Sequence, residues 1–170
     1  MAVEVTVFVA AGSNLGDSRS HLGFGLERLN AAFGCRVFRI SPWYRSTAIG
    51  PGQQNDYING VIELRTTRPP LSLLDLLQEV ESAAGRARKI RWGARTLDQD
   101  MLLYADIELC NARLKLPHPR LMERNFVVYP LHDLAPSLVL PQGMPIARLR
   151  RELGDEGLRR LEPEQRVGIG

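Results

Sequence analysis

The chain has 170 residues, which is the size of one domain rather than two. Hydrophobic residues make up 44% of the sequence and charged residues 24%, a balance that predicts a packed core and excludes a disordered chain. The net charge of +3, from 22 Lys and Arg against 19 Asp and Glu, does not by itself indicate a nucleic-acid-binding protein, and no apolar run approaches the ~20 residues that cross a bilayer.

The chain is predicted to begin with a strand and a helix. Residues 3–11 are almost wholly apolar and rich in β-branched side chains, which is typical of a strand buried on both faces. A turn over residues 12–16 follows, and Asp17 or Ser18 can cap the next helix. The apolar positions of that helix recur at helical spacing before Gly34 ends it, and they are Leu22, Leu26, Leu29 and Phe33.

Two strands and a second helix are predicted next. Residues 35–47 and 57–67 are expected to be extended. Residues 48–56 are too many for a tight hairpin turn, so we expect a surface loop there. Pro69 and Pro70 favour the start of a helix, which an apolar stripe continues as far as Gly85.

The last predicted strand, over residues 97–104, completes the fold class. An extended piece over residues 108–116 is a candidate to pair with it. The order β-α-β-β-α-β is the split βαβ, ferredoxin-like arrangement, so we expect an α+β fold with an antiparallel sheet and helices packed on it. Beyond it, residues 126–134 are predicted to be helical. We assign residues 1–140 to the main domain and residues 141–170 to a C-terminal appendage of the same domain, without a function.

Asp98 and Asp100 are the first candidates for chemistry. They lie two apart on a predicted strand, so both carboxylates project from one face about 7 Å apart. Paired carboxylates suit Mg²⁺, which keeps several waters and is commonly shared with substrate phosphates. A run of cations with no acid among them precedes the pair: Arg86, Arg88, Lys89, Arg91 and Arg95. Together these groups favour phosphoryl transfer, and the alternative is a solvent-facing strand edge with salt bridges.

Two further features near these aspartates are candidates for a role at a binding site. Trp92 and Gly93 interrupt the cationic run, which indicates a loop over residues 86–95 that can close over a ligand. His118 lies between two prolines and can donate to a phosphate or transfer a proton, although a structural role is more common for such a residue.

Several separated segments of the chain carry motifs that occur together, in the same order, in one enzyme family. They are AAGSNLGD (10–17), YRSTAIG (44–50), QNDYING (54–60), ESAAGRARKIRWGARTLDQDMLLY (81–104) and LPHPRLMERNFVVYPLHDLAP (116–136). With these motifs the chain resembles the 6-hydroxymethyl-7,8-dihydropterin pyrophosphokinase family. The resemblance implies an ATP- and Mg²⁺-dependent enzyme of folate biosynthesis, which transfers pyrophosphate from ATP to the hydroxymethyl oxygen of the pterin and releases AMP.

The resemblance also implies roles for individual residues. The catalytic residues would be Arg86, Arg95, Asp98 and Asp100, with both aspartates holding two Mg²⁺ ions on the ATP phosphates. The ATP-binding residues would be Gln78, Glu81, Arg88, Arg91, Trp92, Arg113, His118 and Arg124. Tyr57 and Phe126 would stack on the pterin, and its polar edge would be bound by Ser46, Ala48, Ile49 and Asn59.

The chain departs from the family pattern at Gln99, which stands between the aspartates where an apolar residue is usual. Strand alternation places its side chain on the opposite face from theirs. The implied partners are the small molecules ATP and 6-hydroxymethyl-7,8-dihydropterin, with no nucleic acid and no membrane, and we expect a cytoplasmic monomer.

Two alternative hypotheses remain at this point. The first is a ferredoxin-like module that binds nucleic acid through basic loops and exposed aromatic side chains. Asp98 and Asp100 argue against it, because paired acids repel a phosphate backbone unless metals intervene. The second is a pterin or nucleotide binder without catalysis.

Overall fold

The computed structural model describes residues 3–14, 17–47, 56–85 and 96–162. The elements follow in the order β1 (Val5–Ser13), α1 (Ser18–Ala31), β2 (Cys35–Ile40), β3 (Tyr44–Ser46), β4 (Tyr57–Thr66), α2 (Pro70–Ala84), β5 (Asp98–Tyr104), β6 (Leu109–Cys110), β7 (Lys115–Leu116), a short 3-10 helix (Leu121–Glu123), α3 (Asn125–Leu134), α4 (Ile146–Leu153) and β8 (Leu158–Arg160). Within these ranges no helix is long and apolar enough to cross a membrane.

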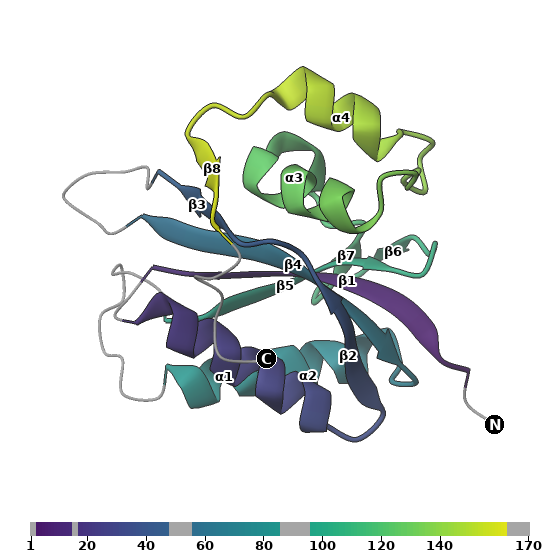
Figure 1. Ribbon diagram of the computed structural model, residues 1–170. Helices are drawn as coiled ribbons and strands as arrows, with labels where there is room; N and C mark the ends of the chain where they lie inside the picture. Colours follow the sequence, from purple (N-terminus) through teal and green to yellow (C-terminus); the bar gives the residue numbers. More distant parts are fainter. Residues whose placement is uncertain (1–2, 15–16, 48–55, 86–95, 163–170) are drawn as a thin grey trace.

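The main sheet is antiparallel throughout the described residues. Its strands lie in the order β5-β1-β4-β3-β8, and β2 pairs with β4 beside β3. Helices α1 and α2 cover one face, and α3 and α4 cover the other (Figure 1). The predicted α+β, ferredoxin-like order of strands and helices is confirmed.

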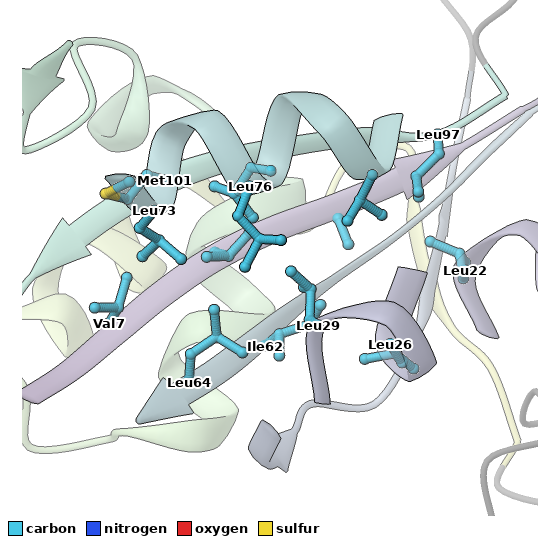
Figure 2. Packing of buried hydrophobic residues seen from close by; sticks show 14 of the residues in the cluster. Val7, Leu22, Leu26, Leu29, Ile62, Leu64, Leu73, Leu76, Leu97 and Met101 are labelled. Carbon is cyan, nitrogen blue, oxygen red and sulfur yellow. The ribbon is translucent and has the colours of Figure 1, made fainter. Parts of the chain in front are cut away.

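The central strand β1 contributes side chains to a hydrophobic core on each face of the sheet. Val7 and Val9 belong to a core with Leu26, Leu73 and other side chains of α1 and α2. Figure 2 shows Val7, Leu26 and Leu73 in this core. Phe8 belongs to the second core, which lies under α3 and α4. Because each fully buried aliphatic side chain stabilises the fold by roughly 1.5–3 kcal/mol, a strand buried on both faces anchors all three layers.

Helix α1 has the predicted N-terminus but ends earlier than its apolar pattern suggests. Asp17 caps it by accepting a hydrogen bond from the Ser20 backbone N–H at 3.2 Å. The helix ends at Ala31, so Phe33 falls in the following turn and is 91% exposed instead of packing on the sheet. Gly34 reverses the chain there with φ +74°, a conformation that glycine adopts without strain.

The single strand predicted over residues 35–47 is two strands, β2 and β3, both paired with β4. Ser41 lies at the break and satisfies the backbone there with its side chain. Its Oγ accepts a hydrogen bond from the Val61 N–H at 2.9 Å, and its own N–H donates to the Val61 carbonyl at 2.9 Å. The sheet therefore continues across the break, although the strand path shifts.

The chain after β5 also differs from expectation. Residues 108–116 do not pair with β5, because β6 and β7 pair with each other in a separate two-stranded sheet. The helix predicted over residues 126–134 is present as α3. The loops predicted over residues 48–56 and 86–95 lie outside the described residues, except for Asp56.

The C-terminal segment continues the fold with elements that the sequence did not indicate. Ile146 and Leu149 of α4 are buried in the core shared with α3. Strand β8 pairs with β3, where Tyr44 lies opposite Arg160. The segment from Ile146 to Arg160 is therefore packed against the main domain at both of its ends.

Candidate active site

A pocket of about 830 Å³ opens on the face of the sheet that carries α3. Its floor comes from one end of β1, β4 and β5, and its sides come from the start of α3 and from the loop between α4 and β8. Residues far apart in the sequence, from Ala10 to Gly157, therefore line one space. A pocket of this volume, partly polar and formed where several elements meet, is the ordinary form of a small-molecule site.

The strand register explains which side chains share the pocket floor. Gly12 of β1 lies opposite Asn59 of β4 on one side and opposite Asp98 of β5 on the other, and Ala10 lies opposite Asp100. Directly opposed residues present their side chains on the same face of a sheet. Small residues on β1 thus separate an acidic strand from a polar one and leave open space between them.

Asp98 and Asp100 both line the pocket, as strand alternation predicts. Asp98 is half-buried and Asp100 is exposed, whereas Gln99 between them is only 4% exposed and faces α1 on the other side. The backbone N–H of Gln99 donates to the Glu81 carboxylate at 2.6 Å, which holds β5 against α2. The described residues contain no cluster of three or more His, Cys, Asp or Glu side chains able to hold a metal, so a cation at the aspartates needs further ligands.

The opposite side of the pocket floor is built around Asn59. Its side-chain N–H donates to the Ser46 hydroxyl at 2.8 Å, and both residues are buried. Gly12 leaves room for the amide, because a Cβ at Gly12 would lie 2.6 Å from Asn59 Oδ1. Tyr57 and Phe126 line the same pocket, so a fixed amide and two aromatic side chains are brought together.

Arg124 and Phe126 flank the N-terminus of α3 on the pocket wall. The Arg124 guanidinium lies 5.7 Å from the centroid of the Phe126 ring, within the range of a cation–π contact. The wall therefore carries a cation beside an aromatic surface, which suits a ligand with both an anionic and a ring portion.

His118 is close enough to Asp100 and Arg124 to interact electrostatically with both. Burial lowers the pKa of His118, the Asp100 carboxylate opposes that shift, and the Arg124 and Arg120 guanidinium groups add to it. Its Nδ1 accepts a hydrogen bond from the Arg120 backbone N–H at 3.1 Å. The neutral imidazole therefore carries its proton on Nε2, where it can donate to an acceptor.

Several sequence-predicted residues are not placed in this pocket. Arg113 forms an ion pair with Asp75 at 2.7 Å and donates to the Gln78 side chain at 3.3 Å. None of the four predicted residues Gln78, Glu81, Arg113 and His118 lines the pocket. The remaining predicted residues lie outside the described residues, and they are Ala48, Ile49, Arg86, Arg88, Arg91, Trp92 and Arg95. Their roles stay predictions.

Other pocket residues were missed from the sequence. Gly12 stood only in a predicted turn, although the length of the apolar run before it could have placed it on the strand. Asn125 follows Arg124 in a quoted motif, but its partners lie in the segment 154–156, and no local pattern connects them. Glu156 and Gly157 belong to the C-terminal segment, in which no sequence motif indicates a function.

One pocket on the α+β sheet thus has an acidic, an amide-bearing and an aromatic side, which suits a small-molecule ligand with an anionic and a ring portion. The model of the family described as 7,8-dihydro-6-hydroxymethylpterin-pyrophosphokinase matches residues 8–136. The chain belongs to this family. The resemblance inferred from the sequence is confirmed, and with it pyrophosphoryl transfer in folate biosynthesis, in preference to a nucleic-acid-binding module.

Two curated relatives extend the match over almost the whole chain. A 2-amino-4-hydroxy-6-hydroxymethyldihydropteridine pyrophosphokinase of Pseudomonas aeruginosa is 44% identical over 155 residues, covering 91% of this chain and 96% of its own length. The enzyme of the same name from Haemophilus influenzae is 38% identical over 159 residues, covering 94% of this chain and 99% of its own.

Solved structures share the fold at much lower identity. A crystal structure of an HPPK-DHPS in complex with substrates superposes with a TM-score of 0.72 at 10% identity, covering 93% of this chain and 46% of that one. A Plasmodium falciparum HPPK-DHPS variant with pterin and p-hydroxybenzoate gives a TM-score of 0.71 at 11% identity, covering 94% and 48%. This chain thus spans about half the length of those proteins, and at such identity the likeness concerns the fold.

Proposed function

We propose that this chain binds ATP, Mg²⁺ and 6-hydroxymethyl-7,8-dihydropterin in the pocket between β1, β4, β5 and α3. The hydroxymethyl oxygen of the pterin attacks the β-phosphorus of ATP and releases its proton to solvent, the bond from that phosphorus to the α-phosphate oxygen breaks, and AMP leaves. The observation that carries the proposal is the placement of Asp98 and Asn59 on either side of Gly12, which brings an acidic and an amide-bearing strand to one pocket floor.

The aspartates fit a hard cation. Asp98 and Asp100 offer carboxylate oxygens on one face of β5 and line the pocket, and further ligands would come from water and phosphate oxygens. Bound Mg²⁺ would neutralise the phosphate oxygens while charge develops on them. We propose two ions, in keeping with the resemblance of this segment to the family motif.

The amide and aromatic side of the pocket fits the pterin. The hydrogen bond from Asn59 to Ser46 fixes the orientation of the amide. Asn59 can therefore present its hydrogen-bonding groups in one fixed arrangement to the polar edge of a heteroaromatic ring. Tyr57 and Phe126 supply aromatic surface for the faces of that ring. Ala48 and Ile49 are proposed to complete the polar edge through their backbone groups.

Cations and a hydrogen-bond donor are proposed to hold the phosphates between these two sides. Arg124 lines the pocket, and His118 offers an Nε2 proton near Asp100. Arg86 and Arg95 are proposed as further phosphate contacts, because guanidinium groups bind phosphate oxygens in bidentate fashion. Arg88, Arg91 and Trp92 are proposed to enclose ATP, with Gln78, Glu81 and Arg113 on the α2 side.

The experiment that tests the proposal is incubation of the chain with ATP, Mg²⁺ and 6-hydroxymethyl-7,8-dihydropterin. We expect AMP and the pterin diphosphate in equal amounts, and no product when EDTA removes the metal. Release of ADP in place of AMP would overturn the assignment.

A cytoplasmic monomer is proposed as well, and light scattering during size-exclusion chromatography measures the oligomeric state.

A further inference from the structure

We infer that Asn125 is a positioning residue that holds the end of α4 and the loop from α4 to β8, residues 153–157, as a fixed wall at the pterin end of the pocket. We call this segment the C-terminal wall. The inference rests on the proposed function for the identity of the ligand, and it assigns a role to a part of the chain that no sequence motif marked.

The C-terminal wall is attached to the pocket on two sides. The side-chain N–H groups of Asn125 donate to the carbonyl oxygens of Gly154 and Glu156, both at 3.1 Å. On the other side, the Thr47 backbone N–H donates to the carbonyl of Gly157 at 3.1 Å. Leu153, Glu156 and Gly157 line the pocket between these attachments.

The elements on either side of the wall are fixed independently of Asn125. Helix α4 is held on α3 by buried Ile146 and Leu149 and by the Arg150 guanidinium, which lies 4.5 Å from the centroid of the Tyr129 ring. Strand β8 is paired with β3. Loss of the Asn125 hydrogen bonds should therefore loosen the loop without undocking the whole segment.

The wall adjoins the pterin side of the pocket rather than the phosphate side. The carbonyl of Gly157 accepts a hydrogen bond from the Thr47 N–H. Thr47 follows Ser46 in the chain, and the Ser46 hydroxyl fixes the Asn59 amide. Glu156 lines the pocket and gives the wall acidic character, which disfavours a polyphosphate and is compatible with a neutral ring that carries N–H groups. Asn125 is the first residue of α3, so its tether connects the wall to the helix that carries the Phe126 ring.

The test compares Asn125→Ala and Asn125→Asp with the unchanged chain. Because each variant loses two neutral hydrogen bonds, we expect the pterin dissociation constant and the pterin KM to rise about tenfold. The dissociation constant and KM of ATP should stay the same. Asn125→Asp keeps the size of the side chain, but a carboxylate cannot donate to the two carbonyls. Its loss of pterin affinity should therefore at least equal that of Asn125→Ala.

Asn30→Ala is the matched control. Asn30 lies on α1, and its side-chain oxygen accepts a hydrogen bond from the Val37 N–H at 2.9 Å, remote from the pocket. The Asn30→Ala substitution should lower the melting temperature without changing the pterin dissociation constant. If Asn125→Ala raises the KM of ATP and of the pterin equally, or changes neither, Asn125 does not position the wall.

Amide hydrogen exchange separates this inference from the proposed function. Exchange of the Thr47 N–H should become faster in both Asn125 variants, because its acceptor is the carbonyl of Gly157. An unchanged chain that makes no AMP would overturn the proposed function, whereas slow Thr47 exchange in Asn125→Ala would overturn the tether. The two failures are therefore distinct.

Discussion

Gly12 and Asn59 lie directly opposite each other on β1 and β4, and the Asn59 side-chain oxygen lies 2.6 Å from the position that a Cβ on Gly12 would take. Real Cβ atoms do not come that close to an oxygen. The atom in the way ends a side chain, so a larger residue at position 12 displaces the Asn59 amide rather than the backbone. The hydrogen bond from Asn59 to Ser46 then depends on the absence of a side chain at Gly12.

We expect Gly12→Ala to fold but to bind the pterin at least about tenfold more weakly, because Asn59 must give up its position and its hydrogen bond to Ser46. The measurement is a pterin binding titration, with thermal unfolding to confirm that the variant is folded. Gly25→Ala is the control, because its Cβ also meets a side-chain end, Gln99 Nε2 at 2.9 Å, but on the opposite face of the sheet. Unchanged pterin affinity in Gly12→Ala would contradict the role given to Asn59.

Asp98→Ala and Asp100→Ala should each lower kcat by about 10²–10³-fold, because each removes a carboxylate from the proposed metal site. Both residues line an open pocket, so the free energy of unfolding should change little. Turnover at saturating Mg²⁺ is the measurement. A normal kcat in either variant would remove that aspartate from the metal site.

Gln99→Leu should raise the free energy of unfolding by about 1 kcal/mol while activity stays near normal. The Gln99 amide is buried with neither its oxygen nor its nitrogen hydrogen-bonded within the described part of the chain, and it faces away from the aspartates. An apolar side chain of similar size removes that desolvation cost. Urea unfolding measures the stability. Gln99→Leu should raise the urea midpoint, and Gln99→Glu should lower it. A loss of turnover as large as that of the aspartate variants would show that β5 has another register.

His118 should make the protein less stable as the pH falls below neutral. Burial lowers its pKa in the folded state from the ordinary value of 6.5, so the unfolded chain binds the proton more readily. The corresponding stability is fully present above pH 6.5 and is lost as the pH falls through the lower folded pKa. His118→Asn keeps an acceptor for the Arg120 N–H but does not titrate in this range. Its free energy of unfolding should depend less on pH between about 5 and 7 than that of the unchanged chain, and equal slopes would contradict the prediction.

Features that depend on residues close together in the sequence could be predicted. The Asp17 cap depends only on residues in the first turn of α1, and the alternation of Asp98, Gln99 and Asp100 depends only on neighbouring residues of one strand. The structure has both features. The helix and strand order follows from periodicity in the same way, because each element must bury its own apolar face.

Features that depend on partners far away in the sequence could not be predicted. The break between β2 and β3 relies on a Ser41 hydroxyl that replaces a backbone group opposite Val61, and Phe33 continues the helical period although α1 has already ended. The contribution of residues 153–157 to the pocket depends on Asn125 and Thr47. A single sequence carries no signal for such pairings, because they connect segments with no shared period.

The pairing of β3 with β8 has a consequence for the order of folding. Tyr44 lies opposite Arg160, so the edge of the sheet beside the pocket is closed by a contact between segments that are far apart in the chain. Such contacts form late, because the long loop between them must be closed first. Strands β1 to β5 and helices α1 to α3 all precede β8 in the chain, whereas the ligand pocket is complete only when the segment that leads into β8 is in place. A ligand that binds the finished pocket should then draw the last segment into place and slow its release.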